Sequence, residues 1–157
     1  MPCAAARKDT RGSSHLRPLH YTHETIHGHG QMVTLTNVVY TTIPLYYERG
    51  SIGALRAKSA NPATELRKQD FSIVNAPSLN GTASGSLYLD DGVSIEQAET
   101  SSIDFSYDAS GHSAMTGSFG YEAGVSITCI TVLGTNSKVV TEKAINLSLT
   151  GPWSVQL

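Results

Sequence analysis

The chain has 157 residues, a formal net charge of −2 at pH 7 and 15% charged residues. A chain of this length forms one domain or two small ones and buries roughly two-thirds of its unfolded surface, so it is long enough for an apolar core. Its lysines and arginines are scattered and give no basic surface for nucleic acid, and no apolar run approaches the roughly 18 residues of a membrane-spanning helix. Neither nucleic acid nor a membrane is therefore an expected partner.

The two cysteines, Cys3 and Cys129, are too few for a disulfide framework or a four-ligand zinc site. Cys129 lies within an apolar stretch and is interpreted as a small buried residue. The sequence contains no serine-hydrolase elbow, no zinc-protease motif and no phosphate-binding loop. No cofactor is expected.

Residues 1–20 are basic and rich in small residues, without a repeating apolar period, and this composition predicts disorder. They also lack the apolar core of a signal peptide, so the chain by itself is expected to remain inside the cell. A misannotated start of the chain is the alternative interpretation of this segment.

Residues 21–56 predict part of a small β-domain. Met32–Tyr40 is rich in β-branched residues and typical of a strand, and Leu45–Tyr47 predicts a second, short strand. Four histidines precede the first strand, but no carboxylate and cysteine pattern of a zinc site accompanies them, so they are interpreted as exposed turn residues rather than metal ligands. These histidines are His20, His23, His27 and His29.

Residues 57–69 have low β propensity, and the Asn61-Pro62 break indicates a linker with at most a helical turn over Thr64–Lys68. In residues 70–157, alternating apolar segments are separated by turns rich in Gly, Asn and Asp. No helical pattern alternates with these segments, so the sequence predicts an all-β fold, an antiparallel β-sandwich, and excludes parallel α/β. The expected strands are 70–75, 83–89, 102–107, 113–121, 125–133, 138–140 and 143–149.

Asp90 and Asp91 follow an alternating strand and precede Gly92, as in a tight turn. Adjacent carboxylates make a poor glycosidase pair, because such pairs are held about 5 to 10 Å apart across the sugar. They are more typical of turn acids that accept backbone N–H bonds. A calcium site built with Glu96 is the alternative, although the spacing is not that of an EF-hand. No catalytic and no metal-binding residue is assigned.

Aromatic side chains in and beside the expected strands could form a stacking platform for sugar rings. Core and cross-strand packing is the favoured interpretation, because aromatic residues are enriched in strands in general. The residues concerned are Trp153, Tyr46, Tyr47, Tyr88, Tyr107 and Tyr121.

Three stretches carry more distinctive sequence motifs. They are Leu66–Val74, the strand and turn Leu87, Tyr88, Leu89, Asp90, Asp91 and Gly92, and Phe119–Tyr121. Together they resemble the C-terminal β-domains of glycoside hydrolase family 31, the fungal α-glucosidases in particular. The resemblance covers residues 21–157 and implies part of the proximal domain and the whole distal domain. In one turn the chain departs from the family's Arg-Gly-Gly, because Glu48-Arg49-Gly50 stands there. Arginine costs roughly 1 kcal/mol or more where φ must be positive.

In this family two aspartates of a large barrel hydrolyse α-glucosides with retention, and the motif of neither aspartate is present in this chain. The resemblance therefore implies a non-catalytic fragment whose partner is the catalytic barrel of a parent enzyme of carbohydrate metabolism. The alternative is a free-standing carbohydrate-binding module, which requires exposed and coplanar aromatic side chains.

Two acceptor sequons for N-glycosylation occur, at Asn80-Gly81-Thr82 and Asn146-Leu147-Ser148. The first lies in an expected turn, where a glycan would be tolerated. Both fit a parent enzyme that is secreted as a glycoprotein.

Overall fold

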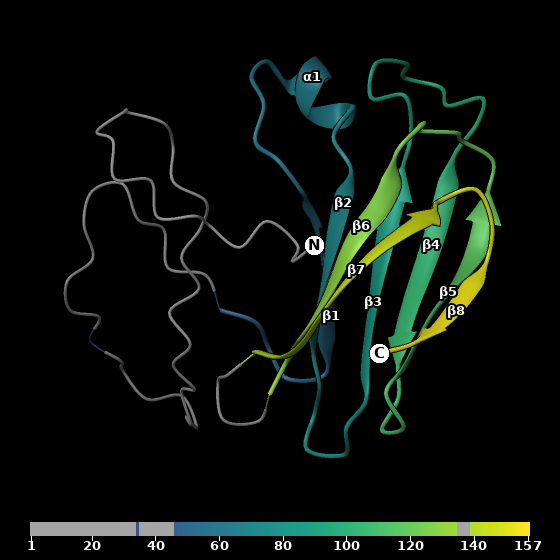
Figure 1. Ribbon diagram of the computed structural model, residues 1–157. Helices are drawn as coiled ribbons and strands as arrows, with labels where there is room; N and C mark the ends of the chain where they lie inside the picture. The colour runs from purple at the N-terminus through teal and green to yellow at the C-terminus, as the bar shows by residue number, and fades with distance from the viewer. Residues whose placement is uncertain (1–33, 35–45, 135–138) are drawn as a thin grey trace.

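The computed structural model describes residue 34 and residues 46–134 and 139–157, which form eight strands and one short helix (Figure 1). The helix α1 covers Ala63–Arg67. The strands are β1 (Ser51–Arg56), β2 (Phe71–Ala76), β3 (Ala83–Leu89), β4 (Ser101–Tyr107), β5 (His112–Phe119), β6 (Ser126–Leu133), β7 (Val139–Ser148) and β8 (Trp153–Gln156).

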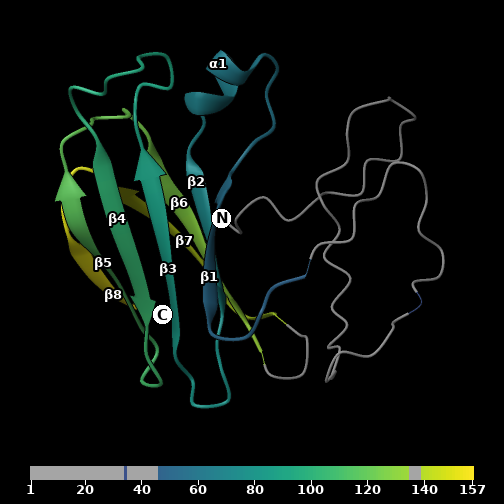
Figure 2. The ribbon, with the colours of Figure 1, turned by 180° about the vertical axis from the view of Figure 1, so that it is seen from behind.

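The strands form one hydrogen-bonded sheet in the order β7-β6-β2-β1-β3-β4-β5-β8. It consists of two four-stranded halves, because β1 and β3 share a single parallel residue pair, Ser51 and Ser84. β2 and β6 are also parallel, and all other neighbours are antiparallel. Figure 1 and Figure 2, seen from opposite sides, both place β6 and β7 in one layer and β3 and β4 in the other.

Side chains from the two halves meet in one apolar core. β4 illustrates how the sequence produces it: Ser101, Ile103 and Phe105 are buried, and the residues between them are exposed. This period of two places one face of the strand against the core. The most buried apolar members of the core are Phe71, Ile73, Ile127 and Ile130 from one half and Ile103, Phe105 and Met115 from the other.

Gly85 allows the two halves to join. A Cβ atom at this position would lie 2.2 Å from the backbone oxygen of Ile52 in β1, well inside van der Waals contact. β3 can therefore approach β1 here only because residue 85 has no side chain.

The all-β prediction is confirmed, and β3 begins and ends at the expected residues. Three details differ. The expected segments 138–140 and 143–149 belong to one strand, β7, and the short strand β8 was not expected. Tyr46 and Tyr47 lie outside any strand, and the strand begins at Ser51 instead.

The sequence assigned residues 51–56 to a domain that precedes the sandwich. In the structure these residues form β1, which pairs with β2 along its whole length and so lies within the same sheet as the strands after residue 70. The other boundaries of the expected domains remain predictions. The expected strand Met32–Tyr40 falls outside the described residues, apart from Thr34, which is not in a strand.

The described parts of the chain contain no helix that is long and apolar enough to cross a membrane.

Candidate functional site

The three stretches that carry the family resemblance meet at one end of the sheet. β1 and β3 separate beyond their single shared pair, and a groove of about 500 Å³ lies between their ends, beside α1. We call it the α1 groove. A volume of this size is within the range of ligand pockets. The lining residues are Leu66, Arg67 and Phe71 from the first stretch, Leu87, Tyr88, Leu89 and Asp90 from the second, Tyr121 from the third, and Ala54, Arg56, Ala63 and Ala123.

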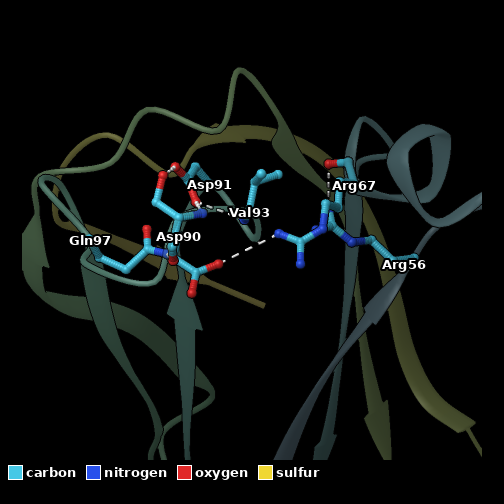
Figure 3. Close-up of polar contacts among 7 residues, drawn as sticks. Arg56, Arg67, Asp90, Asp91, Val93 and Gln97 are labelled. Carbon is cyan, nitrogen blue, oxygen red and sulfur yellow. Dashed lines mark hydrogen bonds and ion pairs between the residues drawn. The ribbon is translucent and has the colours of Figure 1, made fainter.

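Arg67 joins the first stretch to the second. Its Nη1 atom lies 3.5 Å from Oδ1 of Asp90, and the two side chains are 49% and 27% exposed (Figure 3). An ion pair this exposed contributes little to stability by itself, about 1 kcal/mol at most. The closer contact is with Gly92, where a Cβ atom would lie 1.7 Å from Cζ of Arg67. Gly92 also has a φ of +66°, which favours glycine, and the end of the flexible Arg67 side chain occupies the space where a Cβ would lie.

Arg56 holds the end of α1 against the sheet. Its Nη1 donates hydrogen bonds to the backbone oxygens of Arg67, at 3.0 Å, and Gln69, at 2.6 Å. Its guanidinium also lies 4.0 Å from the centre of the Phe71 ring, as in a cation–π contact. Burial lowers the pKa of Arg56, and the neighbouring charge of Arg67 lowers it further. A five-residue helix is not stable alone, so contacts of this kind position α1.

Asp91 organises the turn that follows β3. Its carboxylate accepts hydrogen bonds from the Ser94 hydroxyl at 2.6 Å and from the backbone amides of Val93 and Ser94 at 2.9 and 3.0 Å (Figure 3). These bonds, the one from the Ser94 hydroxyl first, hold the pKa of Asp91 well below its usual range. Asp91 is therefore the turn acid that the sequence predicted, whereas Asp90 pairs with Arg67 instead.

The third stretch is fixed by Ser101. This fully buried side chain donates to the backbone oxygen of Tyr121 and accepts from its amide, both at 3.0 Å. Tyr121 is thereby held beside the α1 groove. It also lines a smaller hollow of about 180 Å³, whose other lining residues are Asp91, Ser94, Glu96, Gln97, Ala98 and Glu99.

Curated proteins similar to this chain are fungal glucosidases. The probable alpha/beta-glucosidase agdC of Aspergillus fumigatus is 41% identical over 152 residues, which covers 87% of this chain and 17% of that protein. The probable alpha/beta-glucosidase of Arthroderma benhamiae is 47% identical over 117 residues, covering 73% and 13%. The probable alpha/beta-glucosidase agdC of Aspergillus flavus is 51% identical over 87 residues, which covers 55% of this chain and 10% of that protein. This chain is homologous to a segment of those glucosidases. The resemblance inferred from the three stretches is confirmed.

The chain spans only about a sixth of the length of these curated glucosidases, 17% in the Aspergillus fumigatus case. No protein-family model matches it. Among solved structures, the family 31 alpha-xylosidase of Xanthomonas citri is 22% identical with a TM-score of 0.42, over 69% of this chain and 13% of that one.

In this glucosidase-related chain, three of the six aromatic residues singled out in the sequence pack against the core. Tyr107, Tyr121 and Trp153 are partly buried against it, and the rings of Trp153 and Phe105 lie 6.4 Å apart at 46°. Tyr88 is 58% exposed. The interpretation as packing residues is therefore confirmed for these three side chains but not for Tyr88.

Two remaining aromatic residues lie before β1. Tyr46 is 48% exposed. The ring of Tyr47 packs over Gly53, where a Cβ atom would lie 2.7 Å from Cε1 of the ring. In the turn between these tyrosines and β1, the residue with a positive φ, +88°, is Gly50. The departure from the family pattern at Arg49 therefore leaves that requirement for glycine satisfied.

A calcium site formed by Asp90, Asp91 and Glu96 is not assembled. Across the described residues, no group of three or more His, Cys, Asp and Glu side chains could hold a metal ion. The histidines at positions 20, 23, 27 and 29 lie outside the described residues.

The two sequons occupy different local structures. Asn80 is exposed in the turn between β2 and β3, which is closed by a 2.8 Å hydrogen bond from the Ser78 amide to the Thr82 oxygen. Asn146 is exposed on β7, a strand at the edge of the sheet. Cys129, in β6, is 5% exposed, as expected of a buried residue.

Sequence reasoning missed the parts played by Arg56 and Ser101. Each acts on a partner far along the chain, 11 to 13 residues away for Arg56 and 20 for Ser101. Local pattern carries no signal for such contacts. The only available hint was that Ser101 continues the inward-facing positions of β4.

Proposed function

We propose that this chain is a non-catalytic accessory β-domain of a family 31 α-glucosidase-related protein, and that the catalytic barrel lies in the remaining part of the parent. Its similarity to fungal glucosidases and its 17% share of their length support this proposal. On this proposal the parent hydrolyses α-glucosidic bonds, and the accessory domain covers apolar surface of the barrel that would otherwise contact water.

The observation that carries the proposal is the set of carboxylates at the α1 groove. Only one, Asp90, is among its lining residues, and that one pairs with Arg67. A retaining glycosidase needs two carboxyl groups about 5 to 5.5 Å apart, and its acid needs a raised pKa. The neighbouring Asp91 has a lowered pKa and is bound to its own turn. The groove therefore lacks the means to cleave a glycoside.

The first test is activity. The purified chain is incubated with a chromogenic α-glucoside and with maltose, beside a mock preparation. We expect no turnover above the mock. Turnover by the chain would contradict the proposal, because the acid and the nucleophile would then have to lie within these 157 residues.

The second test measures the accessory role directly. In the Aspergillus fumigatus relative, the segment that matches is replaced by the matched part of this chain, and a second version lacks the segment altogether. We expect the chimera to fold and to hydrolyse its substrate, and the deleted version to be insoluble or inactive. A deleted version as active and stable as the whole protein would refute the accessory role.

We also propose that the parent is secreted and carries a glycan on Asn80. The exposed turn between β2 and β3 supports this choice over Asn146, whose neighbour Leu147 packs against the core. The check is peptide mass spectrometry of the chimera, secreted from a fungal host, before and after removal of N-linked glycans. An unmodified Asn80 would argue against this assignment.

A carbohydrate-binding module is the second candidate, and one observation favours it. Tyr88 is 58% exposed and lines the α1 groove beside Arg67 and Asp90, so that an aromatic face and two polar groups lie together. The test is a calorimetric titration of the chain with maltose, with Tyr88→Ala as the control. Binding that the substitution abolishes would favour this candidate.

A further inference from the structure

Strand β2 is buried on both of its faces. Every residue of β2 except Ser72 is buried, whereas β4 alternates between buried and exposed positions. Alternation is the pattern of a strand with one face against the core and the other in water, and burial without alternation requires cover on both sides. Ile73 belongs to the apolar core, so the next residue, Val74, points away from it, yet Val74 is only 4% exposed. The core therefore does not account for the burial of this second face.

The covered area extends from β2 to its neighbour β6 and ends there. Cys129 is 5% exposed, although Ile130 beside it is the residue that faces the core. In the next strand, β7, Ala144 pairs with Cys129 and so lies on the same side of the sheet, but Ala144 is exposed. We call the covered area the outer face and define it by Val74, Ala76 and Cys129.

The chain enters β1 from the outer face. The ring of Tyr47 lies against Gly53, where a Cβ atom would be 2.7 Å from Cε1, and Gly53 pairs with Val74. Paired residues of antiparallel strands point to the same side, so the Tyr47 ring lies on the side of Val74. An extended chain spans about 3.3 Å per residue, and β1 and β6 are two strand spacings apart, about 10 Å. A few residues before Tyr47 are thus enough to reach Cys129.

Cys129 gives an independent indication of what covers the outer face. It is joined in a disulfide bond. The sequence contains one other cysteine, Cys3, which belongs to the segment before β1. We propose that residues 1–45 cover the outer face and are fastened to it by a disulfide between Cys3 and Cys129. This inference concerns the chain's own N-terminal segment and does not depend on the proposed accessory function.

The bond forms by oxidation of the two thiols. Each thiol loses its hydrogen, and the two protons and two electrons convert one molecule of oxidised glutathione into two of the reduced form. A docked segment holds Cys3 beside Cys129 and raises the effective concentration of one thiol at the other. The equilibrium of this reaction therefore measures docking, because a segment free in solution would pair Cys3 with any accessible thiol.

The first experiment equilibrates the full chain in a glutathione buffer, once in its native state and once in concentrated urea. Free thiols are then alkylated, and the unreduced peptides are mapped by mass spectrometry. We expect the peptides of Cys3 and Cys129 to be linked within single chains, with an effective concentration about tenfold higher in the native state than in urea.

The matched control moves the second thiol to the other half of the sheet. Cys129→Ser combined with Ser86→Cys keeps two cysteines, but position 86 lies on the exposed face of β3. We expect the link from Cys3 to position 86 to form no more readily in the native state than in urea, although a thiol at position 86 is more accessible than Cys129.

A second pair of variants tests the cover itself. Val74→Asp places a carboxylate beneath the segment, whereas Ala144→Asp places one on the exposed part of the same side of the sheet. We expect the first to lower the effective concentration of the link between Cys3 and Cys129 about tenfold and the second to leave it unchanged. Trp153 fluorescence verifies that both fold, and Val74→Ser tests the same contact if the charged variant does not.

Three outcomes would overturn the inference. One is linkage of Cys3 to positions 129 and 86 with equal effective concentrations. Another is a native chain in which Cys129 stays reduced or pairs only with a second chain. The third is an unchanged effective concentration in the folded Val74 variant, which would mean that residues from position 46 onwards cover the outer face by themselves.

Discussion

Gly92 is subject to two constraints at once, a positive φ of +66° and the guanidinium of Arg67 directly against its backbone. Gly124 has a similar φ of +63°, but no atom lies within 4 Å of where its Cβ would be. The two positions therefore separate backbone strain from the contact between the turn and α1.

Gly92→Ala is expected to destabilise the fold more than Gly124→Ala does. The backbone term alone is about 1–2 kcal/mol at either position. At position 92 the new methyl group must also displace Arg67 from the turn. Urea denaturation of both variants measures the difference, and equal losses would show that Arg67 moves away at no cost.

Asp91→Asn is expected to destabilise the turn in a pH-dependent way. Hydrogen bonds from Ser94 and Val93 hold the pKa of Asp91 below its ordinary value, so the charged form is favoured in the folded state. The stability that this provides is present above the ordinary aspartate pKa of about 4, and it is lost as the pH falls below that value.

The measurement is thermal unfolding of the wild type and of Asp91→Asn from pH 7 down to pH 2. The variant should melt lower at pH 7, and the gap should narrow as the pH falls below about 4. Asp104→Asn removes an exposed carboxylate from β4 and controls for the loss of one charge. A gap that does not change with pH would refute the part assigned to the Asp91 carboxylate.

At the scale of elements, the sheet depends on the place where its halves join. β1 and β3 share one residue pair, and Gly85 allows the approach because a Cβ there would lie 2.2 Å from the Ile52 oxygen. A backbone oxygen cannot rotate away as the end of a flexible side chain can.

Gly85→Ala is therefore expected to cost about 3 kcal/mol, at the upper end of the usual range for overpacking. The neighbouring Ser86 is exposed, and Ser86→Ala should change the free energy of unfolding by no more than about 0.5 kcal/mol. Chemical denaturation of both variants provides the test. A Gly85→Ala protein as stable as the Ser86→Ala protein would mean that β1 and β3 can separate freely.

At the scale of the whole molecule, the two halves share one apolar core despite their narrow junction. Trp153, the only tryptophan, lies in β8 at one edge of the sheet and packs against Phe105. Across the core lie Ile127 and Ile130 of the other half. Neither half can bury its apolar face without the other.

The halves are accordingly expected to unfold together. Trp153 fluorescence reports on the half β3-β4-β5-β8, whereas far-ultraviolet circular dichroism reports on all eight strands. The two signals should give the same midpoint in urea, as a two-state transition requires. Separate midpoints would mean that the halves are independent folding units.

The amino-acid sequence by itself determined most strands, the all-β class and the family resemblance. Apolar alternation, turn residues and sequence motifs are all features of short, continuous segments of the chain. It predicted β3 to the residue, and it predicted that a turn acid would follow this strand.

Only the tertiary structure decided that β1 belongs to this sheet and that α1 lies against the turn after β3. The contact from Arg67 to Asp90 joins residues 23 apart, and the Ser101 bridge to Tyr121 joins residues 20 apart. Such contacts depend on how strands pair and how the chain returns, and a local pattern holds no information about either. The α1 groove arises from those distant contacts.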